Sequence, residues 1–244
     1  MPWLSILAWA FASQTPDVSA IALTPAAVVD LDLGRLKGEL RQIGWSPDAS
    51  QLYVQTAEGN PPREKLHHFV VASEGGPLTP IDREPEWALE YWAFKSDRNA
   101  PGLPALEIDV KVAHETTKIG TGSGRPGTST ASMADANENA AFAGEGQRGT
   151  TWVFRLLDET IAEFKDARPI PGLTFSWGPA GTGTLAFTDR DGRVVFLDRA
   201  KHKRVVPDVK DATLPAWSAD GTRIAYAVKQ GRRKYQLVWC NIAR

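Results

Sequence analysis

Four histidines are the side chains best suited to hold a metal ion or act as a general base, but their sequence neighbours support neither role. His67 and His68 are adjacent in an expected strand, so their side chains leave opposite faces and cannot easily share a metal ion. His114 and Glu115 are also adjacent, so they cannot easily share a metal ion either. His202 lies in a basic turn, where an ordinary solvated position explains a histidine. The histidines therefore predict no metal site.

Two glycine-containing motifs resemble ligand-binding loops but have simpler interpretations. Asp189-Arg-Asp-Gly192 resembles the start of a calcium loop, yet Arg193 and an apolar strand follow it, which favours a hairpin turn. Residues 122–127 have the Gly-x-Gly-x-x-Gly spacing of a dinucleotide-binding loop, but Pro126 interrupts any helix and no βαβ pattern surrounds the match. We therefore expect a flexible loop over residues 120–127, and no cofactor.

The candidate binding site is the basic run Arg232, Arg233 and Lys234, which follows Gly231 in an expected hairpin turn. Three positive charges in a turn suit a phosphate or an acidic partner, although such charges are often only solvated. The chain has no Gly-x-Ser-x-Gly sequence, the motif that presents the nucleophile of α/β-hydrolases. We therefore expect a binding protein rather than an enzyme, with these three residues as its partner-binding residues.

The composition restricts the classes of fold and partner. The chain has 244 residues, and its 28 basic and 29 acidic side chains give a net charge of -1, which provides no global attraction for nucleic acid. The lone Cys240 forms no intramolecular disulfide and leaves the compartment undecided. Nine tryptophans favour a core of rigid aromatic side chains between packed sheets. We expect an all-β protein that binds another protein and no nucleic acid.

Residues 1–20 have features of a signal peptide. The apolar run over 3–12 is too short to span a bilayer but long enough for a signal-peptide core, and small-x-small sequences follow at 10–12 and 18–20. Lysine and arginine are absent before the run, which is unusual for a signal peptide. We expect a periplasmic or secreted protein without a transmembrane segment, with a cytoplasmic location as the alternative.

A unit of strand, tight turn and second strand recurs along the chain. The clearest copy is residues 214–228, in which Trp217 ends the first strand, Asp-Gly closes the turn and apolar residues alternate along the second strand. Trp45 and Trp177 occupy the same place in two other copies. Trp177 precedes Trp217 by 40 residues and follows Trp45 by 132, or three intervals of 44, which suits a four-stranded repeat. We expect these indoles to pack between neighbouring repeats.

The spacing predicts an all-β fold, a β-propeller of about five four-stranded blades. The last copy has only three strands, whereas an isolated strand over 26–33 precedes the first copy. Pairing of this N-terminal strand with the last blade would close the ring and remove two exposed edges. Residues 26–244 then form one propeller, with repeats near 39–82, 85–116, 120–166, 172–209 and 212–244 and with 26–33 as the closing strand.

The sequence Trp-Ser-Pro-Asp at 45–48 and its counterpart at 217–226 resemble the Trp-Ser-Pro-Asp-Gly repeat of TolB-type β-propellers. The match is strong in two repeats, fair in the fourth and poor in the second and third, and with closure it spans roughly residues 26–244. The TolB family carries an α/β domain before a six-bladed propeller, whereas here about forty residues precede the first repeat. The resemblance implies the fold and a non-catalytic, protein-binding or cell-envelope scaffold module.

The alternative is a propeller enzyme, a lyase or hydrolase, with a polar site at the central channel. The two hypotheses differ in one structural respect. The enzyme needs acid, base and cation groups from several blades to converge in one pocket, whereas the binding module needs only an accessible surface.

Overall fold

The computed structural model describes the backbone of residues 17–59, 63–88, 108–112, 115–119, 130–134, 140–146, 149–156, 159–166, 175–179, 182, 184–189, 191–198 and 200–243. Side chains are described only within 17–88 and 176–243, and that of Trp177 is not among them. Two short helices precede the first repeat, the 3-10 helix η1 (Val18–Ala20) and α1 (Leu33–Leu36). No helix of the described residues is long and apolar enough to cross a membrane.

Strands are the main secondary structure of the remaining described residues, which confirms the all-β prediction. In the described part of the chain they are β1 (Ala22–Asp32), β2 (Glu39–Trp45), β3 (Gln51–Glu58), β4 (Lys65–Ala72), β5 (Thr79–Ile81), β6 (Ile108–Val112), β7 (Glu115–Ile119), β8 (Thr130–Ala134), β9 (Ala140–Gly146), β10 (Gly149–Leu156), β11 (Glu159–Asp166), β12 (Phe175–Trp177), β13 (Thr184–Thr188), β14 (Val194–Asp198), β15 (Lys203–Val205), β16 (Ala212–Trp217), β17 (Arg223–Gly231) and β18 (Lys234–Ala243).

The strands form antiparallel sheets in which neighbours in space are mostly neighbours in sequence. The first sheet has the order β2-β3-β4-β5, the middle sheet β11-β10-β9-β8 and the penultimate sheet β12-β13-β14-β15. The last sheet has the order β1-β18-β17-β16, and β6 pairs with β7 in a two-stranded sheet. The described chain therefore consists mainly of four-stranded antiparallel sheets, each formed by consecutive strands except where β1 joins the last one.

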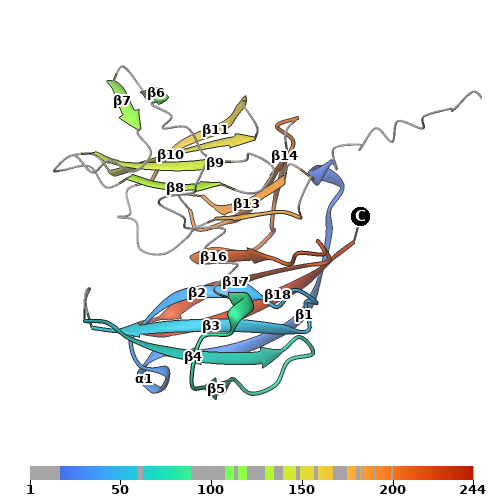
Figure 1. Ribbon diagram of the computed structural model, residues 1–244. Coiled ribbons are helices and arrows are strands. Elements are labelled where there is room, and N and C mark those ends of the chain that lie inside the picture. Colours follow the sequence, from blue (N-terminus) through green and yellow to red (C-terminus); the bar gives the residue numbers. More distant parts are fainter. Residues whose placement is uncertain are drawn as a thin grey trace, which may run out of the picture.

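The N-terminal strand pairs with the C-terminal strand, as the strand count predicted. The register of β1 against β18 runs from Ala22 opposite Ala243 to Asp32 opposite Lys234, and Figure 1 shows the two strands, blue and red, side by side. The strand begins four residues earlier than expected. Pro25 is accommodated there because it lies at a shift in the register, where the missing N–H of proline disturbs the ladder least.

An apolar cluster packs the first sheet against the last sheet. The rings of Trp45 and Trp239 meet edge to face, with centroids 6.4 Å apart. Each indole N–H donates to a backbone carbonyl, that of Trp45 to Ala216 at 3.0 Å and that of Trp239 to Ser73 at 2.9 Å. Because each of these bonds crosses between the two sheets, the ends of the described chain are held against each other by both apolar contacts and satisfied polar groups.

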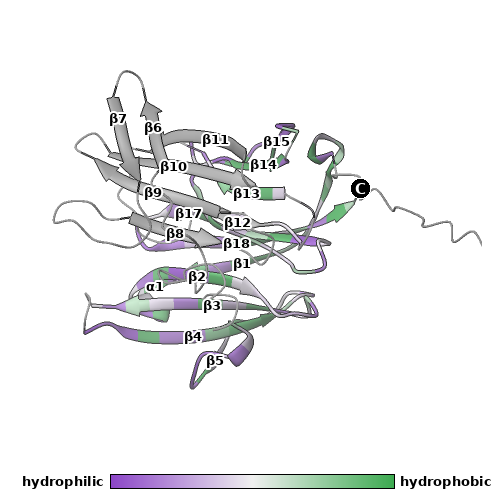
Figure 2. Cartoon of the chain, turned by 45° about the horizontal axis from the view of Figure 1, so that its top comes forward, coloured by the Kyte–Doolittle hydropathy of each residue, from purple (hydrophilic) through white to green (hydrophobic). Residues whose placement is uncertain are grey.

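A second cluster joins the penultimate sheet, the last sheet and η1. Trp217 is 2% exposed, and its ring lies 4.9 Å from that of Phe196 in an edge-to-face arrangement. Its backbone N–H donates to the Ser176 hydroxyl at 3.0 Å, and Val18 of η1 is completely buried in the same cluster. Trp45 and Trp217 thus pack between sheets, as their recurrence predicted. Figure 2 shows bands of hydrophobic and hydrophilic residues along β4 of the first sheet.

The repeated Trp-Ser-x-Asp sequence builds the same turn in the first and last sheets. The hydroxyl of Ser46 donates to Asp48 at 2.6 Å, and that of Ser218 donates to Asp220 at the same distance. Each serine oxygen also accepts the backbone N–H of the residue five positions later, at 2.9 Å in both turns. The aspartate of the motif therefore has a local structural role, which explains why it recurs with the repeat.

Candidate functional site

The predicted partner-binding residues lie at the turn between β17 and β18, where the N-terminal strand ends, with Lys234 as the first residue of β18. The Leu33 backbone N–H donates to the Arg233 carbonyl at 2.9 Å, and the Arg233 guanidinium donates to the Leu33 carbonyl at 2.9 Å. Arg233 therefore helps to join the N-terminal segment to the last sheet. Arg232 and Lys234 flank it and are exposed.

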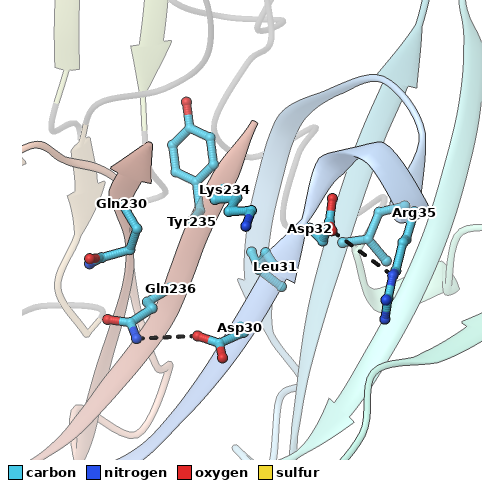
Figure 3. A pocket seen from close by; sticks show the side chains of 9 residues that line it. Asp30, Leu31, Asp32, Arg35, Gln230, Lys234, Tyr235 and Gln236 are labelled. Atoms are coloured by element: carbon cyan, nitrogen blue, oxygen red, sulfur yellow. Dashed lines mark hydrogen bonds and ion pairs between the residues drawn. The ribbon is translucent and has the colours of Figure 1, made fainter. Parts of the chain in front are cut away.

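A pocket of about 490 Å³, here called the seam pocket, lies beside this turn. Its walls come from β1, α1 and the adjoining ends of β17 and β18, and they include Arg35 and Lys234. Figure 3 shows two contacts on these walls, the Gln236 amide donating to Asp30 at 3.2 Å and Arg35 lying 3.9 Å from Asp32. Both signs of charge line the seam pocket, so it suits a charged or polar group better than an apolar one.

A polar cluster occupies the face of the first sheet opposite to the one that packs on the last sheet. The Tyr53 hydroxyl lies 2.7 Å from Nδ1 of His68 and accepts a hydrogen bond from the Gln55 amide at 3.0 Å. The Trp87 ring meets the Tyr53 ring edge to face, with centroids 6.0 Å apart. Burial raises the pKa of Tyr53 and lowers that of His68, so both side chains are neutral near pH 7.

Three side chains in and just after the first repeat, those of Arg41, Gln42 and Glu84, have buried polar atoms without hydrogen-bond partners among the described residues. Gln42 is 2% exposed, pairs with Gln55 across the β2–β3 ladder and has no partner for either amide atom. One carboxyl oxygen of Glu84 is likewise unpartnered, and burial raises its pKa. A carboxyl with a raised pKa is a candidate general acid, so Glu84 is the group on which the enzyme alternative would depend. The sequence analysis singled out only His68 among these residues.

The Asp189 motif forms a hairpin turn, as predicted. One Asp189 oxygen accepts the backbone N–H groups of Asp191 and Arg193, at 3.0 and 2.9 Å. The other oxygen accepts from the Arg193 guanidinium at 2.7 Å. Gly192 has a φ of 70°, the left-handed region that glycine enters without strain. The aspartate oxygens thus bind the turn itself.

The strand histidines separate as predicted. His67 lies 3.3 Å from a Glu58 oxygen, whereas His68 contacts Tyr53, so the two imidazoles have different partners on opposite faces of β4. His114 and residues 120–127 lie outside the described residues, and the predictions for them stay predictions.

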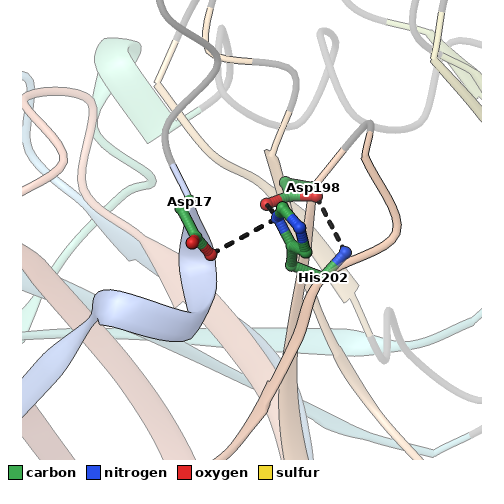
Figure 4. A group of neighbouring side chains, drawn as sticks. All are labelled: Asp17, Asp198 and His202. Carbon is green, nitrogen blue, oxygen red and sulfur yellow. Dashed lines mark hydrogen bonds and ion pairs between the residues drawn. The ribbon is translucent and has the colours of Figure 1, made fainter.

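His202 requires a correction, because solvation in a basic turn does not describe its environment. Its Nδ1 lies 3.0 Å from an oxygen of Asp198 and 3.3 Å from an oxygen of Asp17, as Figure 4 shows. The Asp198 side chain is 1% exposed, whereas those of Asp17 and His202 are about half exposed. The potential ligand atoms of all three residues lie within 4.8 Å of one another. We call this group the Asp–His joint.

The backbone holds both aspartates of the joint in place. Asp198 accepts the N–H of Val18 at 3.2 Å and the N–H of His202 at 2.9 Å. Asp17 caps η1 by accepting the N–H and the hydroxyl of Ser19, at 2.8 and 2.6 Å, and these bonds lower its pKa. The sequence analysis missed the joint because Asp17 and Asp198 come from opposite ends of the chain. The only local signal was an aspartate four residues before a histidine at the end of a strand.

Comparison with known proteins identifies no family. No family model matches the chain, and no curated protein matches it significantly. Among solved structures, Sqt1 from Chaetomium thermophilum is 17% identical over 85% of this chain and 44% of its own, with a TM-score of 0.24. TolB from Acinetobacter baumannii is 11% identical over 85% of this chain and 55% of its own, with a TM-score of 0.35.

Virginiamycin B lyase from Staphylococcus aureus is 11% identical over 89% of this chain and 74% of its own, with a TM-score of 0.27. The chain spans about half the length of the Sqt1 and TolB chains that it matches. At these scores the similarity is too weak to assign either a fold or a function, so both must be argued from the chain itself.

Proposed function

We propose that the chain forms a β-propeller of about five four-stranded blades, closed by β1 on the last blade, and that it acts as a non-catalytic protein-binding module. The arrangement of the described sheets supports this fold. The last sheet packs on the first sheet through the Trp45 cluster and on the penultimate sheet through the Trp217 cluster. Contact between the first and last members of a series of sheets is what a ring requires.

The partner binds at the seam where β1 meets β18. The observation that carries this proposal is that Lys234, one of the three predicted cations, lines the seam pocket. Lys234 lines that pocket together with Arg35, and Arg232 is exposed two residues from Lys234 in the same turn. The pocket walls also carry Asp30 and Asp32. We infer that the seam receives an acidic segment of a partner protein, because Arg232 and Lys234 are exposed cations at the turn beside this pocket and can attract the carboxylates of that segment. A periplasmic or extracellular scaffold role, similar to that of TolB-type propellers, belongs to the same proposal.

The test compares two charge-matched variants. Partners that co-purify with the wild-type protein from native extracts are identified, and the dissociation constant of each purified partner is then measured. We expect the double variant Arg232→Glu and Lys234→Glu to weaken binding at least tenfold, or about 1.4 kcal/mol. Arg204→Glu with Lys210→Glu reverses two exposed charges away from the seam and serves as the control.

Binding should also weaken with added salt, because exposed charges are screened within about 8 to 10 Å at ordinary ionic strength. Equal loss of affinity in both double variants would show that only net charge matters. If the double variant Arg232→Glu and Lys234→Glu binds the partner as tightly as the wild-type protein does, the partner binds elsewhere on the molecule.

A further inference from the structure

We propose that Asp17, Asp198 and His202 bind a divalent transition-metal ion such as Zn²⁺, which fastens η1 to the end of β14. This proposal is independent of the partner-binding function. It rests on the convergence of two carboxylates and one imidazole from segments about 180 residues apart. Imidazole with carboxylate is a donor set that suits Zn²⁺, whereas Mg²⁺ and Ca²⁺ prefer oxygen ligands alone.

The separations of the His202 imidazole from both carboxylates fit a single ion, and the two carboxylates lie within 4.8 Å of each other. Zinc bonds to imidazole nitrogen and carboxylate oxygen are about 2.0 to 2.2 Å long, so two ligands of one ion lie about 3.0 to 3.5 Å apart. Nδ1 of His202 lies 3.0 Å from Asp198 and 3.3 Å from Asp17. An ion between these atoms would replace the contacts of the imidazole with the two carboxylates and would need little movement of the side chains.

Other hydrogen bonds already orient the ligands. Asp198 is held by the backbone N–H groups of Val18 and His202, and Asp17 is held by Ser19. Such contacts around the ligands are typical of metal sites, because they fix the carboxylates before the ion arrives. Val18 is fully buried, which fixes the backbone beside Asp17.

The partial exposure of the three residues leaves the proposed metal site accessible from solvent. Asp198 provides a buried ligand, whereas the side chains of Asp17 and His202 are 52% and 49% exposed. Solvent can therefore fill the remaining coordination positions, as in zinc sites with three protein ligands. Since β1 begins at Ala22, directly after η1 and Ile21, an ion here would also fix the start of the strand that pairs with β18.

The test measures zinc binding by the full chain after treatment with a chelator. We expect one equivalent of Zn²⁺ to bind with a dissociation constant in the micromolar range or tighter and to raise the thermal unfolding temperature. His202→Ala should lose at least tenfold in affinity. Asp17→Asn should show the same loss while its side-chain oxygen still accepts the Ser19 N–H, so a general folding defect would not explain the result.

His67→Ala is the matched control, because His67 pairs with a single carboxylate, that of Glu58. This variant should bind Zn²⁺ as the wild-type protein does. The proposal is wrong if the wild-type protein binds no Zn²⁺, or if His202→Ala binds Zn²⁺ as tightly as the wild-type protein does. The Asp–His joint would then be only a hydrogen-bonded contact. Equal stabilisation by Mg²⁺ would also overturn the assignment, because the imidazole would then contribute nothing.

Discussion

At the scale of single residues, the recurring tryptophans behave as packing residues rather than ligand contacts. Trp45 and Trp217 are 3% and 2% exposed, and each packs an aromatic ring of the chain edge to face. Trp177 stands in the same place of the repeat, and its side chain lies outside the described part. A tryptophan that recurs with the repeat is expected to pack at the interface between neighbouring sheets, because that interface also recurs.

Replacing Trp217 tests this interpretation. We expect Trp217→Ala to lower the free energy of unfolding by about 3 to 5 kcal/mol, because it removes a buried indole and leaves a cavity beside Phe196. Arg232→Ala, at an exposed position, should change the free energy of unfolding by less than about 0.5 kcal/mol. Urea denaturation followed by circular dichroism gives both values. If Trp217→Ala unfolds at the wild-type midpoint, the indole belongs among the surface residues available to a partner.

At the scale of elements, the Trp-Ser-x-Asp turn is built mainly by local side-chain hydrogen bonds. The bonds of Ser46 and Asp48 in the first sheet and of Ser218 and Asp220 in the last join residues within five positions of each other. These bonds need no distant segment, which makes the sequence of the turn recognisable wherever it recurs.

The turn predicts how stability depends on pH. Hydrogen bonds from Ser46 and Ser50 lower the pKa of Asp48 from 3.8 to about 2. A carboxylate with a lowered pKa in the folded state stabilises the protein above the unfolded pKa, and this contribution is lost as the pH falls through the folded value. We therefore expect the unfolding temperature to decline as the pH is lowered from 5 toward 2.

Asp48→Asn should be less stable than the wild-type protein at pH 7 and should approach it at low pH, because the variant has no carboxylate to protonate. Asp82→Asn changes an exposed aspartate and is the control, with no expected effect. Thermal unfolding at a series of pH values measures the difference. Parallel curves for Asp48→Asn and the wild-type protein would contradict the role assigned to the carboxylate.

At the scale of the whole molecule, the pairing of the chain ends organises the described structure. β1 contributes Leu31, which is 1% exposed, and α1 contributes Leu33, which is fully buried. The bonds between Leu33 and Arg233 extend the connection beyond the strands. The N-terminal segment is therefore part of the core as well as the outer strand of the last sheet.

Deletion of residues 1–34 tests this connection. The loss of Leu31 and Leu33 from the core would alone cost about 4 kcal/mol or more, and the exposed edge of β18 would offer a surface for pairing with another chain. We expect a lower unfolding temperature, oligomers, or both. Size-exclusion chromatography with light scattering, together with thermal unfolding, distinguishes these results. A monomer with an unchanged unfolding temperature would show that closure by β1 does not stabilise the protein.

The sequence by itself determined the features that depend on local interactions. The turns could be predicted because the hydrogen bonds of their serine side chains span at most five residues, and the burial of Trp45 and Trp217 followed from the place of each tryptophan before such a turn. The pairing of β1 with β18 could also be predicted. The sequence showed an isolated strand before the first repeat and only three strands in the last repeat, which needed a fourth.

Only the tertiary structure decided which side chains meet across sheets. Asp17 and Asp198 come together because η1 packs against the end of β14, and no local pattern encodes this contact. The Arg233 guanidinium binds the Leu33 carbonyl and is not simply solvated, and this contact likewise depends on where the packing of β1 on β18 places α1. The physical reason is the same in both cases: hydrogen bonds within a turn are fixed by the residues that form it, whereas contacts between sheets are fixed by the packing of the whole chain.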